Sequence, residues 1–286
     1  MAEIIYLNGQ LIPRSKAKLS PFDHGFLYGY GLFETMRAYQ GHIFRLEHHL
    51  ARLHRSAQSL GLANRLATFS FEAACKKTLE ANKLKDARLR LTVSAGEGDM
   101  TPDSSTCASP TVLITAQNVV PLPPEKYESG FKATLSSLRR NSLSPLSRLK
   151  STCYTENILA RMAAKAAKYD EAILLNEQGY LAGGSSTNIF LVNNGKLITP
   201  SLESGILPGI TREAVLEIAR SSNIRTQERQ VELTELIEAE EAFVTNSILE
   251  LMPLTWFEGK PIGTSKPGKL TKEMMADYRK LVNATL

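Results

Sequence analysis

Apolar residues recur along the first part of the chain with the spacings of both strands and helices. Two short apolar runs, residues 4–7 and 11–12, flank Asn8-Gly9, the dipeptide most typical of a two-residue hairpin turn. From Leu46 to Leu60 apolar residues recur every three or four positions, which predicts an amphipathic helix that Gly61 ends. The chain is therefore predicted to begin with an antiparallel hairpin, followed by a helix.

The same reading extends through the next sixty residues. Residues 71–83 predict a second helix, with Ser70 as its N-cap. Residues 87–93 alternate between apolar and polar with period two, as a half-buried strand does, and residues 111–114 form another short apolar run. We expect this part of the chain to fold as a mixed α+β domain.

A proline-rich segment separates this domain from the rest of the chain. Residues 119–124 contain three prolines, which favour an extended and stiff connection. We therefore expect an N-terminal domain at 1–118, a linker at 119–125 and a larger C-terminal domain at 126–286. The elements predicted beyond the linker are helices at 155–168 and 211–221 and strands at 172–175, 188–192 and 242–246.

Composition narrows the class of protein. With 286 residues, of which 43% are hydrophobic and 22% charged, the chain is typical of a globular protein of two ordinary domains. The net charge of +5 is scattered, so no nucleic-acid surface is predicted. No run approaches the ~18 apolar residues of a membrane helix. Together with three cysteines that lack Cys-x-x-Cys spacing, this predicts a cytoplasmic protein without a disulfide framework or zinc site.

Residues 205–212 could bind an anion. Glycines at 205 and 209 would let the backbone approach a ligand, and Thr211 at the start of a helix would add free N–H groups and the helix dipole, which favour a phosphate. The alternative is that Thr211 is an ordinary N-cap. The segment lacks the spacing of a nucleotide-binding P-loop.

Lys150, shortly before a predicted helix, is a second candidate. A partly buried lysine can lose its proton and attack a carbonyl carbon to form a Schiff base, although most lysines are solvated surface cations. Tyr154 is by itself more typical of a packing residue than of an acid or a ligand.

Other catalytic classes have less support. The five histidines all lie in the first 60 residues, and the spacing of His48, His49 and His54 is poor for metal binding. We therefore expect surface histidines and no metal site. No Gly-x-Ser-x-Gly elbow nominates a serine nucleophile.

Taken together and in order, several segments resemble the class IV aminotransferase family. The segments that carry the resemblance, which spans nearly the whole chain, are residues 20–37, 44–53, Lys150 with Tyr154 and Asn157, 170–176, 184–190, 207–212 and 245–247. The resemblance implies an α+β protein of fold type IV, made of two mixed α/β domains. It also implies pyridoxal 5'-phosphate (PLP) as cofactor, an amino-acid-like substrate and a homodimer.

The resemblance assigns roles to individual residues. Lys150 matches the lysine that holds PLP and then moves protons at the substrate's Cα, and Tyr154 matches the tyrosine facing the cofactor's phenolic oxygen. The positions that match the family's phosphate-binding residues are Arg52, Ile210, Thr211 and Ser247.

One position departs from the family pattern. Directly before Gly184-Ser185 the family usually has a glutamate that forms a salt bridge with the pyridine nitrogen, whereas this chain has Gly183. Without that anion the ring nitrogen should be protonated less often and the cofactor should be a weaker electron sink. We expect impaired or unusual PLP chemistry unless water or another side chain replaces the carboxylate.

The resemblance leaves the reaction open. Ala95 stands where the D-amino acid enzymes carry an arginine, which counts against that specificity. Thr35, in place of glycine after Phe33-Glu34, and Asn246-Ser247, in place of Gly-Thr, favour aminodeoxychorismate lyase, in which a threonine matching Thr35 is proposed to assist proton transfer. That reaction eliminates pyruvate and gives 4-aminobenzoate for folate synthesis. The alternatives are a branched-chain or other amino-acid aminotransferase and a non-catalytic relative, the latter because of Gly183.

Overall fold

The chain forms two compact units in a computed structural model that describes residues 3–286. The first unit comprises the chain up to Val120 together with Leu149–Cys153 and the last two residues, and the second comprises Pro121–Arg148 and Tyr154–Ala284. Lys150 thus lies in the first unit, not in the C-terminal domain where we expect it from the sequence, because the backbone of residues 149–153 pairs with a strand of the first unit.

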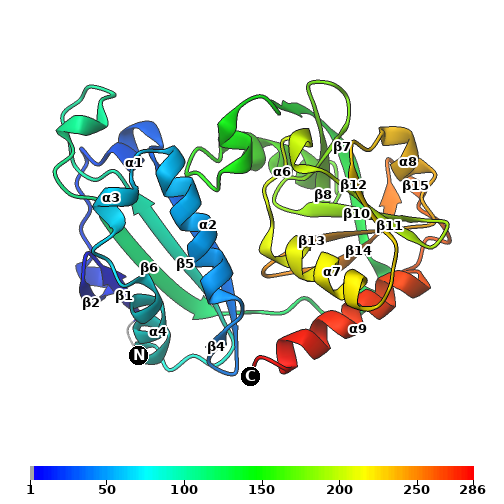
Figure 1. Cartoon of the computed structure of the whole chain (residues 1–286), viewed down its shortest axis with the longest axis horizontal. Helices are drawn as coiled ribbons and strands as arrows, with labels where there is room; N and C mark the ends of the chain where they lie inside the picture. The colour runs from blue at the N-terminus through cyan, green and yellow to red at the C-terminus, as the bar shows by residue number, and fades with distance from the viewer. Residues whose placement is uncertain (1–2) are drawn as a thin grey trace. The chain divides into compact units, whose positions relative to one another are not determined.

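The first unit is a sheet covered by helices on one face (Figure 1). Within the described residues its strands follow the order β2-β1-β6-β5-β3-β4, and every neighbouring pair is antiparallel. The strands are β1 (Ile4–Leu7), β2 (Gln10–Pro13), β3 (Gly31–Tyr39), β4 (His42–Ile43), β5 (Ala87–Ser94) and β6 (Thr111–Asn118). The helices are α1 (His24–Tyr28), α2 (Leu46–Ser59), α3 (Ala63–Leu66) and α4 (Phe71–Ala81). The predicted hairpin, both helices and both strands are confirmed, although the Ser70 side chain makes no capping hydrogen bond.

Alternation along the strands decides what faces the helices. Leu32 and Met36 of β3 join Leu89 and Leu91 of β5 in a core closed by apolar side chains of α2 and α4. Because side chains of successive strand residues point to opposite faces, Phe33, Thr35 and Arg37 lie on the other face of the sheet.

The second unit contains a mixed sheet with the strand order β12-β11-β10-β13-β14-β7-β8-β9, and β15 pairs with β14. Its strands are β7 (Phe131–Arg140), β8 (Glu171–Asn176), β9 (Leu181–Gly184), β10 (Asn188–Asn193), β11 (Lys196–Pro200), β12 (Thr226–Arg229), β13 (Glu241–Asn246), β14 (Glu250–Phe257) and β15 (Lys260–Pro261). Its helices are α5 (Pro124–Ser129), α6 (Thr155–Ala166), α7 (Ile210–Ser221), α8 (Leu233–Ile237) and α9 (Lys269–Asn283). The elements predicted beyond the linker are all found, and α5 begins inside the expected linker.

Helices of the second unit pack directly on its sheet. α7 and α9 lie side by side and contact β13 (Figure 1). α6 packs through Ala160 and Ala164 on Ala172 and Leu174 of β8. The N-terminal ends of α6 and α7 are thereby fixed relative to the strands β8, β10 and β13.

Candidate active site

Lys150 is held against β3 by backbone hydrogen bonds. The Phe33 N–H donates to the Lys150 carbonyl at 2.8 Å, and the Thr152 N–H donates to the Gly31 carbonyl at 2.9 Å. The Lys150 ammonium group lies 4.5 Å from the centre of the Phe33 ring, and the Arg90 guanidinium lies 3.8 Å from the centre of the same ring. Two cations therefore share one aromatic ring on this face of the sheet.

This environment changes the acid–base behaviour of the lysine. Burial of the ammonium group is the main cause, and the charges of Arg52, Arg90 and Arg88 add to it, so that the pKa of Lys150 falls to about 8 although Glu34 opposes the change. At pH 7 about a tenth of this amine is therefore unprotonated, a much larger share than in a lysine with the ordinary pKa. A neutral, partly buried amine is the form that attacks a carbonyl carbon.

On the helix-facing side of β3, Glu34 forms a buried network with α2. Arg52 donates to Glu34 through Nε at 2.8 Å and Nη2 at 2.6 Å, and His49 Nδ1 lies 2.7 Å from Glu34 Oε2. Burial by itself would raise the pKa of Glu34, but Arg52 and His49 lower it to about 2. Burial lowers the pKa of His49, so we assign it as a neutral imidazole that donates from Nδ1 to the carboxylate.

The sequence encodes this network through two spacings. His49 and Arg52 are three residues apart on α2 and so share a helix face, and Glu34 stands between the core residues Leu32 and Met36. The prediction of surface histidines is wrong for His49, and also for His24, which is buried with Nε2 at 2.9 Å from the Asp99 carbonyl oxygen. A charged residue inside a buried alternation is the available signal for Glu34.

Thr35 lies on the opposite face from this network. It pairs with Arg90 across β3 and β5, and Arg37 pairs with Arg88 two residues along. Thr35 therefore shares a face with Phe33 and with three arginines. Directly opposite like charges are unfavourable in a sheet, so this face is suited to an anion.

In the second unit, the segment Ser185–Asn188, here called the hub segment, joins three separate parts of the chain. Asn157 of α6 donates from Nδ2 to the Ser185 carbonyl at 2.5 Å. Asn246, beside Ser247, donates from Nδ2 to the Ser186 carbonyl at 3.4 Å. The third contact runs from Asn188 Nδ2 to the Leu207 carbonyl at 3.0 Å, just before α7. The segments that carry Tyr154, Ser247, Ile210 and Thr211 are thus tied to one place.

The start of α7 differs in detail from the prediction. Gly209 is the N-cap, and Ile210 and Thr211 are the first two helical residues, so Thr211 is not the N-cap. A Cβ atom at residue 209 would lie 2.0 Å from Asn188 Oδ1, so any other residue here would displace the Asn188 side chain that donates to the Leu207 carbonyl. The first N–H groups of a helix have no partners within it, and α7, with twelve residues, offers a site for a phosphate.

The local backbone explains why residue 183 is a glycine. Its φ is +85°, a conformation that side chains rarely adopt, and an added Cβ would lie 2.6 Å from the Thr187 carbonyl oxygen. The backbone of β9 is therefore shaped for a glycine, and a glutamate does not fit at residue 183 without a shift of the hub segment.

The predicted site residues fall into two groups. Thr35, Arg52 and Lys150 belong to the first unit, and the second contains Tyr154, Ile210, Thr211 and Ser247. Within residues 3–286 no cluster of histidine, cysteine, aspartate or glutamate residues could hold a metal ion, and no helix is long and apolar enough to cross a membrane.

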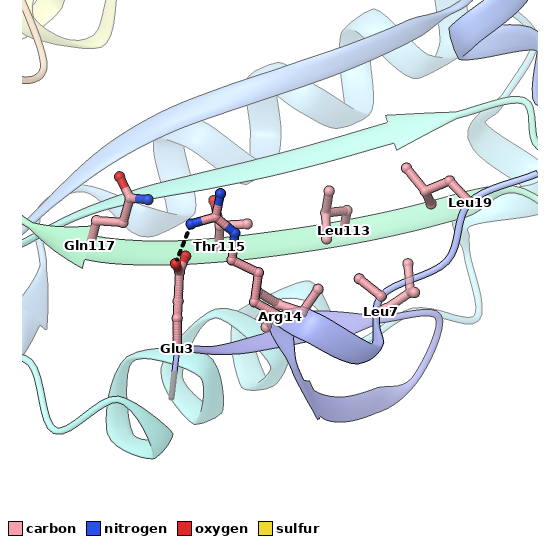
Figure 2. A pocket seen from close by; sticks show the side chains of 9 residues that line it. Glu3, Leu7, Arg14, Leu19, Leu113, Thr115 and Gln117 are labelled. Atoms are coloured by element: carbon pink, nitrogen blue, oxygen red, sulfur yellow. Dashed lines mark hydrogen bonds and ion pairs between the residues drawn. The ribbon is translucent and has the colours of Figure 1, made fainter. Parts of the chain in front are cut away.

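A hollow of about 240 Å³ in the first unit carries none of these residues. Figure 2 shows Leu7, Leu19 and Leu113 lining one part of it and an ion pair between Glu3 and Arg14 in another. Its lining contains no lysine that could form a Schiff base, so this chemistry is not placed there.

Known proteins resemble the chain over almost its whole length. A family model described as amino-transferase class IV matches residues 31–256. A putative branched-chain-amino-acid aminotransferase of Methanocaldococcus jannaschii is 38% identical over 276 residues, which is 96% of this chain and 95% of that protein. An aminodeoxychorismate lyase of Bacillus subtilis is 37% identical over 279 residues, covering 97% and 94%. The solved structure of a branched-chain amino acid aminotransferase from Thermobaculum terrenum in its PLP form has a TM-score of 0.85 at 27% identity and covers 98% of this chain and 94% of that one.

Proposed function

The chain belongs to the class IV aminotransferase family, and from this premise we propose that it eliminates pyruvate from 4-amino-4-deoxychorismate to give 4-aminobenzoate, a step of folate synthesis. It is an enzyme of this PLP-dependent class with the α+β architecture of fold type IV. The reaction and the residue roles given below are our proposal.

The residues present fit the cofactor. Lys150 has the lowered pKa that an amine needs to react with an aldehyde at neutral pH. Arg52 and the N-terminus of α7 suit a phosphate group, with Ile210, Thr211 and Ser247 as the other phosphate ligands and Tyr154 beside the phenolic oxygen. The chemistry that bound PLP supplies is an electron sink for the bonding electrons at the substrate's Cα.

The chain's own residues then divide the remaining work. The Lys150 amine would take the proton from the amino-bearing carbon of the bound substrate, a role that its pKa of about 8 suits. The Thr35 hydroxyl, on the face shared with Phe33, assists proton transfer as the bond between the ring and the enolpyruvyl oxygen breaks, so that enolpyruvate leaves and the ring becomes aromatic. Glu34 and His49 hold Arg52 in one orientation.

The observation that carries the lyase proposal is the arginine face beside Lys150. Arg37, Arg88 and Arg90 lie on the same face of the sheet as Thr35. Aminodeoxychorismate bears two carboxylates, and guanidinium groups bind carboxylates strongly. A leucine side chain offers no such group.

The test is to load the enzyme with PLP and compare two activities. Pyruvate release from aminodeoxychorismate is expected to exceed α-ketoglutarate-dependent deamination of leucine. Thr35→Val should lower pyruvate release by about 10²-fold or more, within the range of one proton-transfer group. Thr115→Val, a matched change across from Arg90 on the next strand, should not. Deamination of leucine without pyruvate release would contradict the proposal.

The second candidate function is transamination of branched-chain amino acids. Its support is the 38% identity to the Methanocaldococcus jannaschii protein and the likeness to a solved branched-chain aminotransferase. The same pair of assays decides between the two.

We also propose a cytoplasmic homodimer. Cys75, Cys107 and Cys153 are free thiols, which agrees with a reducing compartment. Sedimentation at micromolar concentration tests the oligomeric state, and a monomer would contradict it.

A further inference from the structure

Glu171, the first residue of β8, is completely buried and has only neutral hydrogen-bond partners. Its Oε1 accepts from the backbone N–H of Ala172 at 2.9 Å, from the N–H of Ser185 at 3.1 Å and from the Ser185 hydroxyl at 2.5 Å. Its Oε2 accepts from the Thr187 hydroxyl at 3.1 Å. Across residues 3–286, no ion pair involves this carboxylate.

A buried carboxylate without a cation is unusual. Taking a charge out of water costs several kcal/mol even after relaxation, and hydrogen bonds from neutral groups offset only part of this. Glu34, the comparable buried carboxylate of the first unit, has Arg52 beside it. The arrangement around Glu171 therefore lacks a positive charge that a ligand could supply.

The position of Glu171 indicates which ligand could supply this positive charge. Two of its partners, Ser185 and Thr187, belong to the hub segment, whose other contacts hold the start of α7 and the turn that carries Ser247. The Glu171 carboxyl carbon also lies 2.9 Å from where a Cβ atom of residue 184 would be. Glu171 thus lies next to Gly183-Gly184, where the backbone leaves no room for an acidic side chain of residue 183.

We propose that Glu171 is the anion that stabilises the protonated ring nitrogen of PLP in this chain, acting through the hydroxyl groups of Ser185 and Thr187. This inference rests on the proposed function. Glu171 is a positioning residue: its negative charge orients the two hydroxyl dipoles and favours the charged form of a base next to them. It replaces the carboxylate that Gly183 cannot provide.

The test follows the ring nitrogen directly. The holoenzyme is prepared with PLP labelled with ¹⁵N in the ring, and the nitrogen chemical shift is recorded against pH. We expect a protonated ring nitrogen at pH 7 in the wild type. In Glu171→Gln we expect its pKa to fall by a unit or more and PLP affinity to weaken about 10-fold, the equivalent of one pKa unit.

Glu177→Gln is the matched control. Glu177 also accepts from a serine backbone N–H and hydroxyl, those of Ser142, but its side chain is exposed. It should leave both the chemical shift and the affinity unchanged. If Glu171→Gln does not fold, the double variant Ser185→Ala, Thr187→Val removes the hydroxyl groups instead and should give the same shift in pKa.

An unprotonated ring nitrogen in the wild type, or a chemical shift that none of these variants changes, overturns the inference. Borohydride reduction followed by peptide mapping keeps this result separate from the proposed function. If PLP is trapped on Lys150 but the pKa of the ring nitrogen is the same in the wild type and in Glu171→Gln, only the inference fails. If no PLP is trapped on Lys150, the proposed function fails as well.

Discussion

Arg52 forms a bidentate ion pair with Glu34, from Nε to Oε1 at 2.8 Å and from Nη2 to Oε2 at 2.6 Å, in the core beneath α2. Both side chains are buried, so neither charge can turn to water when the other is removed. The pair fixes the guanidinium that we assign to the cofactor's phosphate. It therefore couples folding of the first unit to the orientation of the guanidinium proposed to bind the phosphate.

Glu34→Gln should destabilise the protein strongly. The substitution keeps the shape but leaves the Arg52 charge buried without a counter-ion, which costs about 3–5 kcal/mol. Urea unfolding of the apoprotein measures the change. Glu72→Gln removes an exposed ion pair with Lys76 and should cost less than about 1 kcal/mol. Equal losses of unfolding free energy in the two variants would contradict the expected cost of leaving the buried Arg52 charge without a counter-ion.

Lys150→Met should stabilise the apoprotein at pH 7. The pKa of Lys150 falls from 10.5 to about 8 on folding, so below pH 8 the folded state carries a charge that burial disfavours, at a cost of up to about 3 kcal/mol. As the pH rises from 8 to 10.5 the folded wild type loses this proton before the unfolded chain does, and its stability increases. Melting temperatures of both proteins across that range should converge. A variant less stable than the wild type at pH 7 contradicts the lowered pKa.

Thiol reagents should distinguish the three cysteines. Cys153 is exposed, whereas burial raises the pKa of Cys75 to about 12 and that of Cys107 above its usual value. Since the thiolate is the reactive form, iodoacetamide at pH 8 should label Cys153 first. Peptide mapping after short exposure checks this, and Cys153→Ser should remove the fast phase. Early modification of Cys75 would show that its strand-covering helix opens readily.

Gly183→Ala should cost more stability than Gly179→Ala. Both glycines have a φ near +90°, but a Cβ atom at residue 179 meets nothing within 4 Å, whereas at residue 183 it lies 2.6 Å from the Thr187 carbonyl oxygen. The difference isolates the steric overlap, which we expect to add about 1–3 kcal/mol. Thermal unfolding of both variants measures it. By the same argument Gly183→Glu should not improve turnover.

Local patterns predict much of the fold. The Asn8-Gly9 hairpin, the helix that begins at Leu46 and the strand of residues 87–93 depend on short-range periodicity, and the structure confirms them. The unit to which Lys150 belongs does not follow from such patterns, because its partner strand β3 lies over a hundred residues earlier. Pairing over that distance leaves no periodic signal in the sequence.

The same lack of a local signal explains why only part of the candidate site could be predicted from the sequence. The candidate residues follow from the family resemblance and from the helix start predicted at Thr211, which the structure moves by one position, to Ile210. Glu34, His49 and Glu171 are not among them, because a buried charge becomes recognisable only when its partners are placed around it. The hydroxyl groups that bind Glu171 are 14 and 16 residues away along the chain.

The return of residues 149–153 to β3 has a consequence for synthesis on the ribosome. Cys153 contacts Gly29, a residue made 124 positions earlier, so the first unit cannot close until the whole of β7 and the loop after it have left the exit tunnel. Until then the backbone N–H of Phe33 cannot form its hydrogen bond to the Lys150 carbonyl. Two fragments made by cutting the gene between codons 120 and 121 would consequently not each fold as a complete unit. Lys150 would lie on the C-terminal fragment, although it packs in the first unit.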